Sequence, residues 1–305
     1  MKNSSIKKYV FLGDTNSINI EIIIKSHAFL KEKLQYLIIG NKSELKEYIN
    51  KIKSKIKINE IFDPINFYDY KKNKINIFNI EDIHRDKYKN LLNQINLANK
   101  LSSHTKYDLV TMPINKSVIK KKLKFIGMTE YLGKLNNCET TMLMYGENFS
   151  VIPLTTHINL KDVNKYLNKI EIKKKLELIM SLLKLRKYNF NFKEIKFLCF
   201  NPHCGEDNTL GNEDKILNHL IKKNFKKISG PYAADSAFNN YKKNTLYIST
   251  YHDQALIPYK IINKKGFNLT LGLSYLRLSP THGTAENIKF KNQSDNSSYL
   301  ACMLN

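Results

Sequence analysis

The first third of the chain alternates short apolar runs with amphipathic stretches. Residues 9–12 form an apolar run, helical periodicity follows around residues 18–30, and a second apolar run occupies residues 37–40. This order is typical of βαβ units, whose parallel strands are covered by helices. Helical patterns return at 86–101 and 170–185, with a strand pattern at 107–112. The sequence therefore predicts an α/β fold with mostly parallel sheets covered on both faces.

The length and the cysteine pattern favour a cytoplasmic protein without disulfides. A chain of 305 residues can bury a full core, and its four cysteines show no paired C-x-x-C spacing. The apolar run at residues 9–13 is too short for the core of a signal peptide. No later run approaches the roughly 20 residues that cross a bilayer. We expect a reducing compartment and no membrane partner.

The net charge of +23 does not indicate a nucleic-acid-binding protein, because 47 of the 50 basic residues are lysines spread along the chain. Lysine, asparagine and isoleucine are abundant throughout, as in proteins from AT-rich genomes. Proteins that bind nucleic acid usually concentrate arginine and aromatic residues on one face. We expect no nucleic-acid partner. The rare arginines Arg85, Arg186 and Arg277 are candidates for tasks that need a guanidinium group.

Three histidines directly follow strand-like runs. His157, His203 and His252 come after the apolar segments 151–156, 195–200 and 246–251. Ligands of open parallel sheets bind outside the carboxyl ends of the strands. Three imidazoles with an open fourth position are typical of a catalytic metal site. The alternative is that each histidine only caps a strand or bonds a loop carbonyl, and His282 is a fourth candidate.

Other residues indicate an anionic ligand. Lys260 ends the segment that begins at His252, while Asn268 and Arg277 flank the strand-like segment 269–273. A lysine, an amide and a guanidinium group together suit a phosphate or a carboxylate. Taken alone, Lys260 is better explained as one solvated lysine among many. The segments 111–116, 127–130 and 230–235, taken singly, are better explained as ordinary turns.

In order along the chain, these segments resemble the 4-hydroxythreonine-4-phosphate dehydrogenases of pyridoxal phosphate (vitamin B6) biosynthesis. The resemblance covers most of the chain. The matching motifs are TMPINK at 111–116, GMTEYL at 127–132, TTHINLKDV at 155–163, NPHCGE at 201–206, GPYAADSAF at 230–238, YHDQALIPYK at 251–260 and NLTLGLSYLRLSPTHGTA at 268–285.

The resemblance implies two α/β/α domains, as in isocitrate and isopropylmalate dehydrogenases, with an inter-domain cleft. The first domain is expected over residues 1–125 together with about 286–305, and the second over 126–285. The resemblance also implies a homodimer, NAD or NADP as cofactor without a G-x-G-x-x-G motif, and one divalent metal ion (zinc, magnesium or cobalt) near the subunit boundary.

The resemblance further assigns roles to residues. It implies metal ligands at His157, His203 and His252 and substrate contacts at position 128 and at Thr129, Lys260, Asn268 and Arg277. Asp235 is expected to act as an acid–base or orienting residue. The implied reaction oxidises the C3 hydroxyl of 4-phosphooxy-L-threonine and then releases carbon dioxide to leave 3-amino-2-oxopropyl phosphate.

The sequence departs from the family pattern at two places. Met128 stands where the family usually has histidine, and a thioether cannot replace an imidazole as a donor. The segment 13–21 lacks the prolines and most of the glycines of the family's first loop. Two alternatives therefore stay open. One is a paralogous dehydrogenase acting on another four-carbon acid phosphate, 4-phosphoerythronate, and the other is a non-catalytic protein that only binds ligand.

Overall fold

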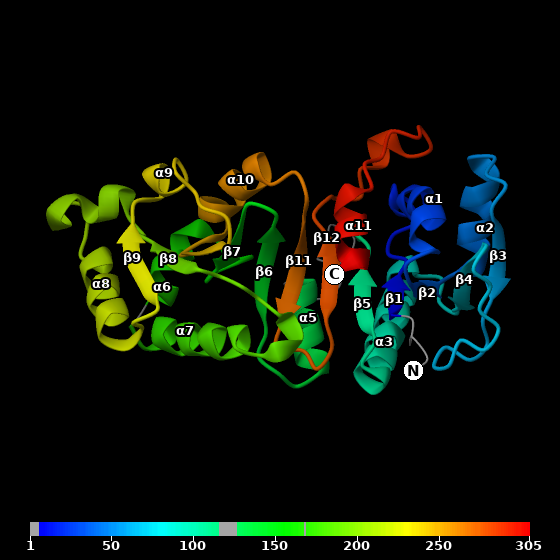
Figure 1. Cartoon of the computed structure of the whole chain (residues 1–305), viewed down its shortest axis with the longest axis horizontal. Helices are drawn as coiled ribbons and strands as arrows, with labels where there is room; N and C mark the ends of the chain where they lie inside the picture. Colours follow the sequence, from blue (N-terminus) through cyan, green and yellow to red (C-terminus); the bar gives the residue numbers. More distant parts are fainter. Residues whose placement is uncertain (1–5, 116–126, 168) are drawn as a thin grey trace. The chain divides into compact units, whose positions relative to one another are not determined.

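The computed structural model describes residues 6–115, 127–167 and 169–305. The chain divides into two compact units (Figure 1). Unit 1 comprises residues 1–139 and 267–305, and unit 2 comprises residues 140–266. The sequence predicted domain boundaries between residues 125 and 126 and between residues 285 and 286. The first of these falls within residues 116–126, which the structure does not describe. The helix at Met128–Leu135 and the strand at Arg277–Pro280 both belong to unit 1, because they pack on its core.

Unit 1 is built on a mostly parallel sheet with the strand order β3-β4-β2-β1-β5-β12-β11. Only β11 is antiparallel to its neighbour β12 among the pairs described in this unit. In chain order the elements are β1 (Lys7–Phe11), α1 (Asn19–Leu30), β2 (Gln35–Gly40), α2 (Lys42–Lys51), β3 (Lys57–Glu60), β4 (Lys74–Asn79), α3 (Lys87–Thr105), β5 (Asp108–Thr111), α5 (Met128–Leu135), β11 (Gly266–Leu271), β12 (Arg277–Pro280), η4 (Glu286–Ile288) and α11 (Ser297–Leu304).

Helices cover both faces of the unit 1 sheet, with α1, α2 and α11 on one face and α3 and α5 on the other (Figure 1). Alternate residues of a strand point to opposite faces. Tyr9 and Phe11 of β1 accordingly pack on the α3 face with Ile95 and Leu132, while Val10 between them is also fully buried. The apolar runs of this unit are continuous because both faces of each strand are buried.

The loop after β1 is organised by Asn19, the first residue of α1. Its side-chain Nδ2 lies within hydrogen-bond distance of the carbonyl oxygens of Leu12 (3.1 Å), Asp14 (3.1 Å) and Pro113 (2.9 Å). The backbone of Asp14 also donates to the carbonyl of Pro113 at 3.0 Å. The departure from the family pattern in this loop therefore leaves an ordered connection between the carboxyl ends of β1 and β5.

Unit 2 repeats the plan with the strand order β6-β7-β10-β8-β9. Strands β7, β10, β8 and β9 are parallel, and β6 is antiparallel to β7. The elements are β6 (Thr141–Gly146), β7 (Phe149–Pro153), η1 (Leu160–Asp162), α6 (Val163–Tyr166), α7 (Lys169–Leu183), η2 (Arg186–Tyr188), β8 (Glu194–Leu198), η3 (Pro202–Asn208), α8 (Glu213–Asn224), β9 (Ile228–Tyr232), α9 (Ala234–Ala237), β10 (Thr245–Ser249) and α10 (His252–Ile262).

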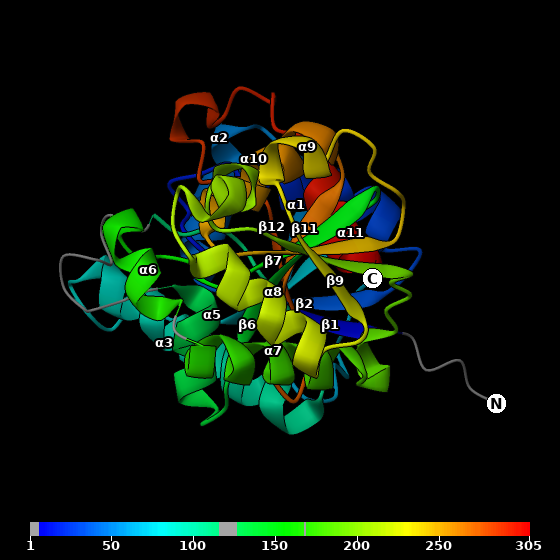
Figure 2. The ribbon, with the colours of Figure 1, turned by 90° about the vertical axis from the view of Figure 1, so that its left-hand side faces the viewer.

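Helices also lie on both faces of the unit 2 sheet. Figures 1 and 2 show α9 and α10 on one face and α7 on the other. Phe149, Tyr247 and Leu256 form part of the core under α10. The predicted α/β class with mostly parallel sheets is confirmed in each unit. Within the residues that the structure describes, no helix combines the length and apolar character needed to span a membrane.

Candidate active site

Four of the predicted site residues follow four neighbouring parallel strands of unit 2. His157 comes after β7, His252 after β10, His203 after β8 and Asp235 after β9, and these strands are adjacent in that order. Parallel strands end at the same edge of a sheet, where ligands of α/β proteins bind. The structure thus places these four residues along one edge of unit 2. The apolar runs before the three histidines predicted this for His157, His203 and His252, whereas no such run was identified before Asp235.

His157 and His252 lie close together, with ring centroids 5.8 Å apart. Two imidazoles that bind one metal ion tetrahedrally have ring centroids about 5 Å apart. The Nδ1 of His252 contacts the Asp253 carboxylate at 2.6 Å, which leaves Nε2 as the nitrogen available to a ligand. Both rings line a cavity of about 280 Å³. This pair suits two ligands of a metal centre.

His203 has different neighbours. Its Nδ1 contacts Glu206 at 2.8 Å and its Nε2 lies 3.4 Å from Asp235. The hydrogen bond with Glu206, together with the charges of Asp235 and Glu206, raises the pKa of His203. The side chain is 62% exposed. No group of three metal-ligating side chains comes together among the described residues of one chain. The three-histidine metal centre therefore stays a prediction.

The segment that carries His203 has an unusual backbone. Residues 203–207 all have positive φ, from 44° at Glu206 to 85° at Gly205. The left-handed conformation costs a non-glycine residue about 1–2 kcal/mol. Four of these five residues are not glycine, so contacts elsewhere must hold the turn. Such strain is concentrated at functional sites in proteins.

The buried Asp214 and the half-buried Gln254 hold the base of this turn. The carboxylate of Asp214, at the start of α8 and 3% exposed, accepts the backbone N–H groups of Phe200 (2.6 Å) and Asn201 (2.8 Å). Gln254 of α10 donates to the Cys199 carbonyl at 2.5 Å and accepts the N–H of Thr250 at 2.9 Å. Gln254 therefore connects the loop before His252 to the loop before His203.

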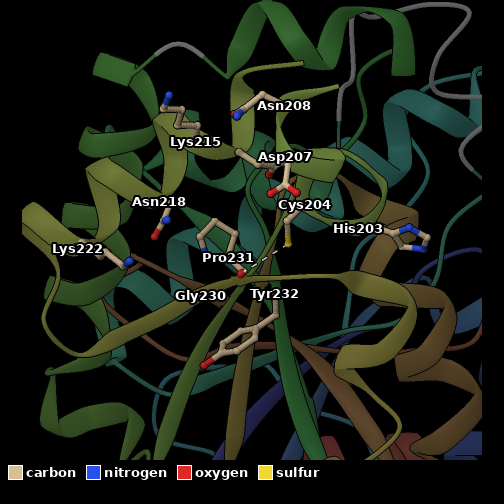
Figure 3. Close-up of a pocket in the computed structure, with 11 residues that line it drawn as sticks. His203, Cys204, Asp207, Asn208, Lys215, Asn218, Lys222, Gly230, Pro231 and Tyr232 are labelled. Carbon is tan, nitrogen blue, oxygen red and sulfur yellow. Dashed lines mark hydrogen bonds between the residues drawn. The ribbon is translucent and has the colours of Figure 1, made fainter. Parts of the chain in front are cut away.

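A cavity of about 560 Å³ lies beside the left-handed turn. Figure 3 shows His203 on one side of it and Asn218 and Lys222 of α8 on the other, with Pro231 between them. The thiol of Cys204 contacts the Pro231 carbonyl at 3.7 Å. The wall is mostly polar, which suits a hydrated or charged ligand.

Unit 1 contains a buried arginine. Arg277, the first residue of β12, is 4% exposed. Its Nε and Nη2 donate to the Thr111 hydroxyl at 2.9 and 2.5 Å, and its Nη1 donates to the Thr270 hydroxyl at 3.1 Å. Burial lowers its pKa to about 10, so the group remains a cation at neutral pH. The hydrogen bonds of Arg277 to described residues all go to neutral hydroxyl groups. The positive charge of the guanidinium can therefore pair with an anionic ligand.

The other predicted substrate contacts in unit 1 lie near Arg277 in the fold. Thr129 of α5 is hydrogen-bonded to Thr270 at 3.1 Å. Asn268 lies on β11, and its Oδ1 is buried without a hydrogen-bond partner among the described residues. A buried unpaired amide oxygen suits a ligand that donates to it. Met128 packs on the cluster around Tyr88, so it contributes apolar contact at the family's histidine position.

Two further candidates, Lys260 and His282, have no described contact with the other predicted site residues. Lys260 is exposed on α10 in unit 2, whereas Arg277 and Asn268 belong to unit 1. His282 bonds the Gly283 carbonyl through Nδ1 at 2.9 Å, and burial lowers its pKa. Lys116 of the motif at 111–116 lies outside the described residues.

Sequence reasoning missed several residues that support the site. Asp214, Gln254, Thr111 and Thr270 each bond a segment that carries a predicted site residue. A detectable signal existed for Gln254, Thr111 and Thr270, which fall inside the motifs at 251–260, 111–116 and 268–285. Asp214 looks like an ordinary helix residue in the sequence.

The two α/β units, the histidines at the strand ends of unit 2 and the buried guanidinium of unit 1 are features expected of an α/β enzyme with an anionic substrate. Comparisons with known proteins specify the family. The family described as "Pyridoxal phosphate biosynthetic protein PdxA" matches residues 32–304. The chain belongs to the PdxA family.

Relatives and solved structures agree with this assignment. The 4-hydroxythreonine-4-phosphate dehydrogenase of Aquifex aeolicus is 36% identical over 309 residues, covering 95% of this chain and 94% of that protein. The protein of the same name from Sulfurihydrogenibium sp. is 33% identical, covering 97% and 95%. The crystal structure of the Klebsiella pneumoniae enzyme of that name superimposes with a TM-score of 0.78 at 25% identity, covering 99% and 98%.

Proposed function

We propose that this protein is a dehydrogenase that oxidises 4-phosphooxy-L-threonine at C3 and releases carbon dioxide, in pyridoxal phosphate biosynthesis. Its relatives over nearly the whole chain carry the name 4-hydroxythreonine-4-phosphate dehydrogenase. The structural observation that carries the proposal is the buried cation of Arg277, held by neutral hydroxyls and suited to one anionic end of this substrate. A cytoplasmic location agrees with the absence of paired cysteines in the sequence.

The chain's own residues bind and orient the substrate. Arg277 pairs with an anionic group of the substrate, and Asn268 and Thr129 accept or donate hydrogen bonds beside it. Lys260 supplies a second cation for the other anionic end. Holding both ends fixes C3 relative to the cofactor, which replaces a random encounter by an oriented one.

His157, His203 and His252 are the proposed metal ligands. The rings of His157 and His252 lie close together, and the ring of His203, which lies between Glu206 and Asp235, is exposed and so accessible to a second copy of the chain in a homodimer. A divalent ion there would supply Lewis-acid stabilisation of the negative charge that develops on substrate oxygen. The Asp253 contact orients the ring of His252 for this task.

The reaction balances with NAD or NADP as the oxidant. With the cofactor bound, the C3 hydroxyl would lose its proton to a base and C3 would lose a hydride to the nicotinamide. The bond between C1 and C2 would then break to release carbon dioxide, and C2 would take up a proton. Asp235, beside His203, is the proposed acid–base or orienting carboxylate. The product is 3-amino-2-oxopropyl phosphate.

The substrate assignment is tested by following NAD or NADP reduction with purified protein and added zinc, magnesium or cobalt. Turnover of 4-phosphooxy-L-threonine supports the proposal. A clear preference for 4-phosphoerythronate would instead favour the paralogous activity, for which the apolar Met128 is the motivating observation. Absence of turnover with both, in protein that holds no metal, would indicate a protein that only binds ligand.

The metal assignment has its own test. His203→Ala should remove bound metal and turnover while leaving the far-ultraviolet circular dichroism spectrum unchanged. His219→Ala is the matched control, because His219 is an exposed histidine of α8 that lines neither cavity. Full metal occupancy in His203→Ala, measured by elemental analysis, would refute the role of His203.

A further inference from the structure

Two threonines on the strands that flank β12 bond the guanidinium of Arg277 from both sides. Thr270 of β11 is the direct antiparallel partner of Arg277. On β5, Leu109 is the partner of Arg277, and Thr111 lies two residues further on, so its side chain is on the same face as that of Leu109. Thr111 and Thr270 are each at most 1% exposed.

Both hydroxyls must accept hydrogen bonds from Arg277, because a guanidinium group only donates. The hydrogen of Thr111 is then directed to the Leu278 carbonyl, 3.5 Å away. The Thr270 hydroxyl also shares a hydrogen bond with the Thr129 hydroxyl at 3.1 Å, in which either group can donate. Each threonine hydroxyl therefore bonds a second partner besides Arg277, and valine, which has a similar shape but no hydroxyl, cannot make these bonds.

The bonds to the threonines leave a specific pair of donors. A guanidinium group carries five N–H groups. The Nε–H, one N–H of Nη2 and one N–H of Nη1 are used by the threonines. One N–H on each Nη atom has no partner in the part of the chain that the structure describes. Two N–H groups of one guanidinium can donate to the oxygens of a carboxylate or phosphate.

We infer that Thr111 and Thr270 are positioning residues, which fix the plane of the Arg277 guanidinium so that its two remaining N–H groups meet an anionic oxygen pair of the substrate. Thr270 also bonds Thr129, so one hydroxyl sets the relative placement of two proposed substrate contacts. This inference rests on the proposed role of Arg277 in substrate binding.

The test compares Thr111→Val and Thr270→Val with Thr111→Ser and Thr270→Ser in the metal-loaded protein. We expect each valine variant to raise KM for 4-phosphooxy-L-threonine at least tenfold with a smaller change in kcat, and each serine variant to stay within about threefold of wild type. Thr245→Val is the matched control, since Thr245 is fully buried on β10 and its hydroxyl has no partner among the described residues. It should leave KM unchanged.

Several outcomes would overturn the inference. Wild-type KM in both valine variants would show that the hydroxyls do not position Arg277. Equal defects in the serine and valine variants would assign the effect to methyl packing. If Thr111→Val does not fold, as judged by thermal unfolding, Thr270→Val and the two serine variants decide the question by the same criteria.

A second measurement separates this inference from the proposed function. Calorimetric titration with inorganic phosphate needs no turnover. Wild type should bind phosphate, Arg277→Met should not, and the two valine variants should bind at least tenfold more weakly. Failure of wild type to turn over the substrate, together with this pattern, would reject the proposed function and keep the inference. Equal phosphate affinity in wild type and both valine variants would reject the inference.

Discussion

The Nε2 atom of His203 lies 3.4 Å from Oδ2 of Asp235, although the two residues are far apart in sequence and follow different strands. Strands β8 and β9 are parallel neighbours, which brings the segments after them together. With Glu206 on the other ring nitrogen, the imidazole lies between two carboxylates. A metal-ligand candidate and an acid–base candidate are thus in direct contact in a single chain.

This contact predicts how His203 titrates in metal-free protein. Glu206 is the larger cause of its raised pKa and Asp235 the second. Both carboxylates favour the imidazolium form. Glu206→Gln should therefore lower the pKa of His203 more than Asp235→Asn does, and both should lower it relative to wild type. Nuclear magnetic resonance of the ring protons across pH 5–8 measures this, and an unchanged pKa in both variants would show that the carboxylates do not face the ring in solution.

The left-handed turn predicts that a side chain at position 205 destabilises the protein. Its φ is +85°, and an added Cβ would approach the Gly211 carbonyl to 3.2 Å. Gly205→Ala should lower the free energy of unfolding by about 1–2 kcal/mol, measured by urea denaturation. Gly283→Ala is the control, because a Cβ there meets no atom within 4 Å. Equal stability of the two variants would contradict the strained geometry.

Gln254 should stabilise both the loop before His203 and the loop before His252, because it bonds Cys199 in the first and Thr250 in the second. Gln254→Glu replaces the amide donor to the Cys199 carbonyl with a second acceptor, while the hydrogen bond from the Thr250 N–H can persist. We expect a loss of about 1–3 kcal/mol of stability and weaker metal binding. Isothermal calorimetry with zinc measures the second effect. Wild-type zinc affinity in a folded Gln254→Glu protein would show that the bridge does not organise the site.

The contacts of Glu21 with Ser294 and Lys25 in unit 1 should be sensitive to acid. It is 3% exposed, and its carboxylate accepts the Ser294 N–H at 3.0 Å and pairs with Lys25 at 3.1 Å. Burial alone would raise its pKa, but the bonds from Ser294 and Lys25 outweigh burial and leave the pKa lowered. The contact therefore stabilises the fold above the unfolded pKa of about 4.3 and is lost as the pH falls through the lower folded value.

Glu21→Gln should consequently cost about 2 kcal/mol at pH 7, with the difference from wild type shrinking below about pH 4. Urea denaturation at pH 7, 4 and 3 follows this. Glu47→Gln is a suitable control, because Glu47 is an exposed glutamate whose ion pair with Lys51 lies at the surface. A pH-independent difference for Glu21→Gln would argue against the ionised contact.

Many of the strands could be predicted from the sequence, because a parallel strand that is buried on both faces consists of a continuous run of apolar residues. The runs before His157, His203 and His252 became β7, β8 and β10, and the helical spacing at 170–185 became α7. The order of strands in the sheet was not predictable, because it depends on long-range pairing such as that of β7 with β10.

The site was predictable only where side chains differ from their surroundings in type. Arg277 stood out because arginine is rare in this chain. The left-handed turn did not, because only one of the five residues 203–207 is glycine, and Asp214 holds the turn from outside the motif. Thr111 and Thr270 lie inside recognised motifs, but their role was not predictable, because threonine is common in strands and the partner of its hydroxyl is known only from the structure.

Unit 1 is discontinuous in sequence, and this affects how a nascent chain matures. Strand β5 receives its neighbour β12 from residues 277–280, which leave the ribosome only after the whole of unit 2. Until then β5 presents an unpaired edge, which is prone to associate with other chains. Unit 2 is contiguous, so a chain halted after residue 266 should hold a protease-resistant segment 140–266 beside a digestible N-terminal part. Residues 267–305 would then complete unit 1, because β12 pairs with the free edge of β5.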